Sequence, residues 1–511
     1  MNISDLQVKL VPLIIAVAVL TSFLLVGLRY KVRESSEYGL GGRSAGRIGG
    51  GAAIASTWMS AASFLGMAGF FYLYGYLALA CVIGWTGGYV LLLILLAGQI
   101  RRFGKYTAPD FVWERYDSPT ARIISALISI TISVIYCAAQ FKGIGILFGW
   151  LFGLPYPAAV TAGAVAVISY LVFAGSLGVM KNQQMQYTIL IISFILPLMI
   201  LAKKLGYFWV LPQFGYGAAL SHVSPEFRTS FTLPFATSSL FQWSALCFTL
   251  MVGTAGLPHV LSRFYIVPNI RDARWSVVWG LFFIALIYWS APAYAVFARL
   301  LEVKNSAAPD PATARDVADM VIITAATQGG LPLWLVGILA AGGLSAAFST
   351  VAGLLMTGAA SFSHDIYAGV VHPNASEYRK MQVAKGFTLV LALAVYFIAL
   401  NPPGLIVEIT AVAFALAGNT IFPAFLLGIW WGRANRQGII AGMLLGVLIT
   451  FSAPLFGRFV PLVAEIFPLT SSALCGVPLV ILVTILGSLL TPPPPERIRR
   501  FLATEVHGHL D

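Results

Sequence analysis

Long apolar runs alternate with short polar or Pro- and Gly-rich turns along almost the whole chain. Most runs reach about 20 residues, the length that a helix needs to cross the hydrocarbon core of a bilayer. They predict thirteen membrane-spanning helices, numbered here as spans 1 to 13: about 9–29, 48–76, 78–100, 120–150, 156–180, 185–204, 236–258, 274–302, 329–362, 383–401, 404–431, 437–456 and 468–490. The connections 205–235 and 303–328 are predicted to be polar or Pro-containing loops.

Composition supports an all-α polytopic membrane protein, whose helices cross the lipid bilayer several times. Of 511 residues, 59% are hydrophobic and only 10% are charged. Soluble domains average roughly 45–50% apolar and about 25% charged residues. A soluble enzyme, a nucleic-acid-binding protein and a disordered scaffold are therefore excluded as classes.

The basic residues predict an orientation. The net charge is +12, and 22 Lys and Arg residues flank the odd-numbered connections and the C-terminal tail, against 8 on the other face. Cytoplasmic loops carry an excess of Lys and Arg, so the N-terminus is predicted outside and the C-terminus inside. This bias accounts for the positive charge without a nucleic-acid partner.

Two spans are interrupted by small and polar residues. Span 2 contains the run Ser56–Ser63, and span 7 contains Val252–Gly256 shortly before Pro258. The two spans are five apart, so they cross the membrane in opposite senses. Paired interruptions of this kind indicate inverted repeats with a binding site between them. The alternative is that the small residues only permit close helix packing.

Three segments carry a family resemblance. They are Glu37–Ser44 leading into Trp58–Gly66, then Gly256–Phe264, and then Ala346–Gly353 ending in Ser363–Tyr367. With these motifs the chain resembles the sodium:solute symporter family from about residue 30 to 450, and within it the acetate permease branch of monocarboxylate symporters.

The resemblance implies a LeuT-type fold with two inverted five-helix repeats. Spans 2–6 (about 48–204) and spans 7–11 (about 236–431) would be the two halves. The predicted organisation is then a first helix and basic loop (1–34), a transport core (35–432), two further spans (433–490) and a cytoplasmic tail (491–511).

The resemblance also implies a sodium site between spans 2 and 9. Its ligands would be the backbone carbonyls of Ser56, Met59 and Ala346 and the hydroxyls of Ser349 and Thr350. Sodium is a hard cation that prefers oxygen ligands. The alternative for the two hydroxyls is a hydrogen bond to the carbonyl four residues earlier in their own helix.

The sequence departs from some relatives in lacking acidic residues at two positions. The span 2 break has Thr57 and Trp58 where many relatives have an aspartate, and Gln183–Gln186 stands where some have an aspartate linked to a second sodium. One coupling sodium is therefore expected rather than two. Proton coupling stays open, although no acid near either break offers itself as the carrier.

A carboxylate substrate is expected at the breaks, where the positive end of a half-helix favours an anion. The candidate substrate-binding residues are Thr57, Trp58, Ser60, Ala61, Ser63, Gln140, Lys142, Gly253, Thr254 and Asn419. Gln140 and Lys142 are two residues apart, about 200° around a helix, so at most one faces the site squarely. Gln140 is preferred, because Lys142 lies toward the outer end of span 4 and its stem can extend outward.

The predicted function is a sodium-coupled symporter that imports a short-chain monocarboxylate such as acetate, propionate, pyruvate or lactate. The alternatives are a symporter for an amino acid or another small solute, or a transporter-like sensor. No metal cluster, nucleophile motif or carboxylate pair suggests an enzyme. Sodium is the expected coupling ion, the bacterial inner membrane is the expected location, and a small two-span membrane subunit is an optional partner by the resemblance.

Overall fold

The computed structural model describes residues 9–29, 47–104, 107–262, 270–305 and 311–508. Within these ranges the chain is helical and contains no β-strand. The predicted motif Glu37–Ser44 and the end of Gly256–Phe264 lie outside them.

The helices follow the predicted spans closely. The first part of the chain forms α1 (Leu10–Arg29), α3 (Arg47–Trp58), the π-helical turn η3 (Ala62–Gly66), α4 (Met67–Tyr74), η4 (Gly75–Ala78), α5 (Leu79–Leu95), α6 (Ala97–Phe103), α7 (Ala108–Tyr116), α8 (Pro119–Phe152) and α9 (Tyr156–Leu205). The middle forms α10 (Pro212–Ala219), η5 (Leu220–His222), α11 (Pro225–Thr232), α12 (Leu240–Gly256), α13 (Pro258–Leu261), α14 (Ile270–Lys304), α15 (Pro311–Val317), η7 (Ala318–Met320) and α16 (Val321–Gln328). The last part forms α17 (Leu333–Ala360), η8 (Ser361–Val371), α18 (Glu377–Leu400), α19 (Ile406–Asn419), α20 (Ile421–Trp430), α21 (Arg436–Phe456), α22 (Pro461–Ile466), α23 (Ala473–Leu489), α24 (Glu496–Phe501) and η9 (Leu502–His507).

Local sequence sets the ends of these helices. Ser118 caps α8 by accepting a hydrogen bond from the Ala121 N–H, and Gly153 ends it with a left-handed φ of 65°. Both are common helix-terminal devices. The resulting helix of 34 residues is long enough to cross a bilayer.

Predicted spans 5 and 6 form one continuous helical segment, α9, of 50 residues. A straight helix of that length would extend about 75 Å. The start of α9 comes soon after Leu151, whose carbonyl oxygen accepts a hydrogen bond from the Lys9 N–H. At the other end of α9, its last turn contacts Gly330. Just beyond Gly330, Gly337 packs against Pro12. Both ends of α9 therefore lie at one end of the molecule, so α9 turns back and its halves correspond to the two predicted spans.

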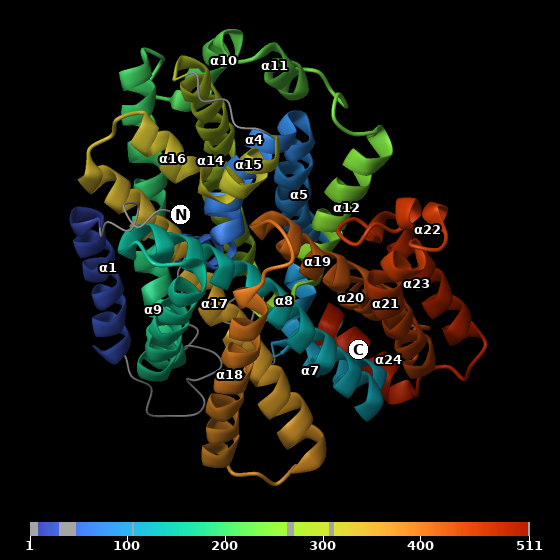
Figure 1. Cartoon of the computed structure of the whole chain (residues 1–511). Coiled ribbons are helices and arrows are strands. Elements are labelled where there is room, and N and C mark those ends of the chain that lie inside the picture. The colour runs from blue at the N-terminus through green and yellow to red at the C-terminus, as the bar shows by residue number, and fades with distance from the viewer. Residues whose placement is uncertain (1–8, 30–46, 105–106, 263–269, 306–310, 509–511) are drawn as a thin grey trace.

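The arrangement is a helical bundle with α17 near its centre (Figure 1). Among the described residues nine helices are long and apolar enough to cross a membrane, and α17 with η8 is the most enclosed of them. Helices α10 and α11 lie at one end of the bundle, and the connection from η8 to α18 lies at the other. Helices α21 to α23 pack on the side opposite α1.

The two long connections differ from the sequence expectation. Both were expected to be loops, but 205–235 contains α10, η5 and α11, and 303–328 contains α15, η7 and α16. These helices are short, and α10, α11 and α15 begin with Pro, at a position where Pro is favoured. Because these helices are too short to form long apolar runs, the pattern that predicted the spans did not predict them.

Candidate functional site at the broken helix

Span 2 is interrupted near its middle, where the polar run predicted a break. Helix α3 ends at Trp58, Met59 and Ser60 are not helical, and the chain resumes at Ala61 before the turn η3. A helix end leaves carbonyls without intrahelical partners, and a helix start leaves N–H groups without them. The carbonyl end carries a partial negative charge and the N–H end a partial positive charge. The break therefore favours a cation on one side and an anion on the other.

The carbonyl side of the break faces α17. The Ser349 hydroxyl donates to the Ser56 carbonyl oxygen at 2.7 Å and lies 2.9 Å from the carbonyl oxygen of Ala346. The Thr350 hydroxyl donates to the Thr57 carbonyl oxygen at 3.1 Å. These five residues are all buried. The predicted hydroxyl pair thus points across to α3 rather than only back along its own helix.

Met59, the remaining predicted cation ligand, lies in the non-helical segment and is fully buried. The oxygens gathered here are neutral carbonyl and hydroxyl groups. Hard cations accept such ligands, and a site without carboxylates binds a cation less tightly than a charged one. This is a suitable property for an ion that must be released at each cycle.

The Gln residues that replace the aspartate of some relatives are buried. Gln183 and Gln186 are both enclosed. Neither residue carries a charge, so no additional carboxylate is available at this position for a second cation.

The N–H side of the break is joined to α8. The Ala61 N–H donates to the Gln140 Oε1 atom at 2.7 Å, and the Ser63 N–H lies 3.4 Å from the Ser60 hydroxyl oxygen. Gln140 is fully buried, and its Nε2 atom has no partner among the described residues. A buried amide nitrogen without a partner is costly, so it marks a place where a polar ligand would be stabilised.

Aromatic rings enclose the break, and the sequence analysis did not identify most of them. The Trp58 indole N–H donates to the Tyr288 hydroxyl at 2.9 Å, and Ser63 bonds the same hydroxyl at 2.9 Å. The Trp58 ring contacts Tyr89 and Phe414 edge-on, with ring centroids 4.9 and 5.5 Å apart. These rings come from spans far apart in the sequence, so only the folded chain brings them together.

Lys142 lies apart from this cluster. Its ammonium group is 2.5 Å from a carboxylate oxygen of Asp319 and donates to the Gly404 carbonyl at 2.9 Å. Asp319 is buried in η7, and burial raises the pKa of its carboxyl while the Lys142 ammonium acts in the opposite direction. Of these two residues Gln140 contacts the break, and its role in substrate binding remains a prediction.

The remaining predicted substrate residues do not gather at the span 2 break with Gln140. In span 7, Gly253 and Thr254 are helical and the break falls at Leu257, just after the run that suggested it. The Thr254 hydroxyl donates to the Leu250 carbonyl in its own helix. Asn419 donates through its Nδ2 atom to hydroxyls of Thr450 and Ser472, in and beside the last two spans.

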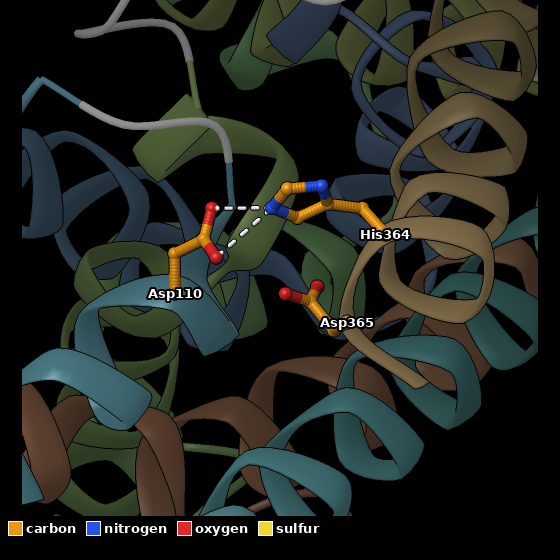
Figure 2. Close-up of side chains that lie close together, drawn as sticks. All are labelled: Asp110, His364 and Asp365. Carbon is orange, nitrogen blue, oxygen red and sulfur yellow. Dashed lines mark hydrogen bonds and ion pairs between the residues drawn. The ribbon is translucent and has the colours of Figure 1, made fainter. Parts of the chain in front are cut away.

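A second polar cluster lies between α7, α8 and η8 (Figure 2). His364 Nε2 lies 3.0 Å from a carboxylate oxygen of Asp110, and ligand atoms of Asp110, His364 and Asp365 all lie within 4.8 Å of one another. The Arg122 guanidinium is 3.0 Å from Asp110 and 3.1 Å from Asp365. Because the Arg122 guanidinium pairs with both carboxylates and His364 contacts Asp110, the arrangement is an ion-pair network that joins the elements.

Comparison with known proteins identifies the family. The model of the sodium:solute symporter family matches residues 38–446. An uncharacterized symporter of Cupriavidus necator is 29% identical over 98% of this chain and 94% of its own length. The uncharacterized symporter YwcA of Bacillus subtilis is 29% identical over 97% of both chains.

Solved structures confirm the expected LeuT-type fold. A Na⁺-coupled sialic acid symporter in a substrate-bound outward-open state matches with a TM-score of 0.77, 17% identity and coverage of 95% of this chain and 99% of that one. Mhp1, a nucleobase-cation-symport-1 family transporter in a closed conformation, matches with a TM-score of 0.51 and 11% identity over 92% of this chain and 98% of its own. The long apolar helices make the chain a multi-pass membrane protein, in bacteria one of the inner membrane. Together these matches show that the chain belongs to the sodium:solute symporter family.

Proposed function

We propose that this protein is a sodium-coupled symporter that imports a short-chain monocarboxylate by alternating access. The observation that carries the proposal is the unpartnered Nε2 atom of buried Gln140 beside the N–H end of the span 2 break. The side-chain carbonyl oxygen of Gln140 accepts the hydrogen bond from the Ala61 N–H, so both protons on its Nε2 atom remain available as donors. Such donors, next to a positive half-helix end, suit a carboxylate.

Sodium is proposed to bind on the opposite side of the same break. Its ligands would be the Ser349 and Thr350 hydroxyls with the carbonyls of Ser56, Met59 and Ala346. The ion would replace the present hydroxyl-to-carbonyl hydrogen bonds at 2.7 and 2.9 Å. It would thereby join α3 to α17. Substrate would bind to the break whose shape the ion has fixed, which gives reciprocal coupling between the two.

The surroundings of the break favour a small anion over the alternative solutes. Trp58, Ser60 and Ser63 are almost fully enclosed, and a Cβ on Gly143 would lie 2.7 Å from the Ala61 Cβ. An amino acid would also need a counter-charge for its ammonium group. None of the described side chains that contact the break above is a carboxylate.

Counterflow in proteoliposomes tests the substrate class directly. Vesicles containing the purified protein are loaded with unlabelled acetate, propionate, pyruvate, lactate, alanine or glucose and assayed for uptake of the same solute in radiolabelled form. We expect the monocarboxylates to exchange only when sodium is present. Exchange with alanine or glucose but not with the acids would reject the monocarboxylate assignment. Binding of acetate without any flux would favour a sensor.

A further inference from the structure

Lys142 and the first turn of α19 together hold a carboxylate that belongs to the chain itself. The Asp319 carboxylate lies 2.5 Å from the Lys142 Nζ atom, and its two oxygens are 3.3 and 3.4 Å from the Ile406 N–H. The Lys142 and Asp319 side chains are 15% and 5% exposed. A Lys ammonium and a helix N-terminus, both presented to one carboxylate, form a complete anion site.

The segment that carries Asp319 packs against α4 and α19. It comprises α15, η7 and α16 and is called the cover segment here. It packs so closely on α4 that a side chain at Gly69 would collide with the Ala318 carbonyl. A second ion pair, Arg315 to Glu408 at 2.8 Å, fastens it to α19, and Arg315 also bonds the Tyr74 hydroxyl. The cover segment is therefore joined to three spans by polar contacts.

Lys142 and Gln140 of the proposed substrate site lie at similar heights on α8 but on different faces of the helix. Lys142 follows Gln140 by two residues, about 3 Å along the α8 axis. Between them in space, Gly143 packs against Ala61 of the break, and the Ile406 side chain lies within 3.5 Å of the same position. The outer site and the Gln140 donors are thus separated by this packing contact, which the substrate would have to pass on its way inward.

We propose that Lys142 and the N-terminal turn of α19 form an outer carboxylate-binding site, which Asp319 fills when the cover segment is closed and the substrate fills when it opens. The inference rests on the proposed function. A buried ammonium without a counter-charge is strongly unfavourable, so opening of the cover segment requires an incoming anion. When the substrate carboxylate replaces that of Asp319, the negative charge and the hydrogen bonds at Lys142 are kept. The exchange therefore leaves the ammonium group paired throughout.

This exchange of carboxylates at Lys142 sets the order in which the substrate binds and the cover segment closes. The substrate carboxylate displaces Asp319 and keeps the cover segment open. When the substrate moves inward to Gln140, Asp319 returns to Lys142 and closes the outer side. A merely structural ion pair would hold the segment in place without distinguishing anions from neutral solutes.

Substitutions at the pair separate these two roles. We expect Lys142→Gln to raise the KM for acetate roughly tenfold, and Asp319→Asn to lower it because the substrate no longer competes with the chain. Tyr74→Phe is the matched control, since it removes the Arg315 contact that holds the same segment to α4 without touching Lys142 or α19, and its KM should stay within about twofold.

The exchanged pair Lys142→Asp with Asp319→Lys gives the decisive contrast. It keeps an ion pair but presents the cation on the moving segment, so the KM for acetate should stay high. Recovery of the wild-type KM in the exchanged pair, or an effect of Lys142→Gln on maximal rate alone, would overturn the outer site.

A measurement without transport distinguishes failure of this inference from failure of the proposed function. Purified Asp319→Asn protein is reductively methylated, and modification of Lys142 is followed by peptide mass spectrometry in sodium acetate and in sodium chloride. Slower modification in acetate, by several-fold, supports the site even if the wild-type protein transports no monocarboxylate. Equal rates in the two salts contradict it.

Discussion

The two broken helices occupy corresponding places in the inverted repeats, yet their chemistry differs. At the span 2 break, hydroxyls from α17 reach the carbonyls of α3, and Gln140 keeps an unpartnered amide nitrogen. At the span 7 break, Thr254 bonds within its own helix, and a Cβ on Gly253 would lie 2.5 Å from the Phe414 carbonyl oxygen. The first break offers donors and acceptors to ligands, whereas the second is closed by packing.

This difference shows how a repeated architecture can divide its tasks. Both breaks release backbone groups from a helix. In span 7 the glycines permit close approach to α19, which suits a packing contact within the second repeat. In span 2 the small polar residues leave groups for ligands. The following predictions test this division, starting with the largest expected effect.

Loss of the hydroxyl pair is expected to have the largest effect. Ser349→Ala with Thr350→Ala removes two of the proposed sodium ligands, and sodium-driven uptake should fall by about a hundredfold or more, at roughly tenfold for each ligand. Uptake is measured in proteoliposomes against sodium concentration. Ser345→Ala is the control, because the Ser345 hydroxyl bonds back to Ala341 in the same helix. Unchanged sodium dependence in the double variant would remove this pair from the site.

Gln140→Glu should affect the substrate rather than the ion. A carboxylate can still accept the Ala61 N–H, but it replaces the amide donors with negative charge. We expect the KM for acetate to rise by about tenfold or more, while the KM for sodium at saturating acetate changes little. Initial uptake rates over a range of both solutes provide the two constants. An equal KM for acetate in the two proteins would mean that the amide does not face the substrate.

Gly253→Ala tests the packing role of the span 7 break. The added methyl group would meet the Phe414 carbonyl at 2.5 Å, and overpacking of this kind costs about 1–3 kcal/mol. The thermal unfolding temperature of the detergent-purified protein should fall, and turnover should fall several-fold. The KM for acetate of the protein that remains folded should be close to that of the wild type. A selective rise in that KM would instead assign the residue to substrate binding.

Thr254→Val is expected to have the smallest effect. The substitution keeps the shape of the side chain and removes a hydroxyl that bonds the Leu250 carbonyl, so uptake constants should change by less than about threefold. Kinetics under the conditions used for Gln140→Glu give the comparison. An effect as large as that of Gln140→Glu would show that both breaks bind substrate, and the proposed division of tasks would be wrong.

Much of the fold followed from apolar length and from charge. Every predicted span overlaps a helix, and the break in span 2 lies where its polar run indicated. The count of thirteen spans, their orientation and the domain boundaries remain predictions. The helices within 205–235 and 303–328 were missed, since amphipathic segments of eight residues or fewer give too little periodicity.

Less of the candidate site than of the fold could be predicted from the sequence. Ser349, from a family motif, and Gln140, a candidate from span 4, both lie at the break, and their roles there remain predictions. Tyr288 was missed because its contact with Trp58 joins residues 230 apart. The same reason applies to Asp319, which pairs with Lys142 across 177 residues. Side-chain partners across such separations depend on the packing of whole helices, which local patterns do not encode.

The central claim is that one break binds sodium and a carboxylate together. It is tested most directly by measuring initial acetate uptake against sodium concentration at a low and at a saturating acetate concentration. The account predicts that the sodium concentration for half-maximal uptake falls as acetate rises, because linked ligands strengthen each other's binding. Uptake that proceeds equally well with choline in place of sodium, or a sodium requirement that ignores acetate, would contradict it.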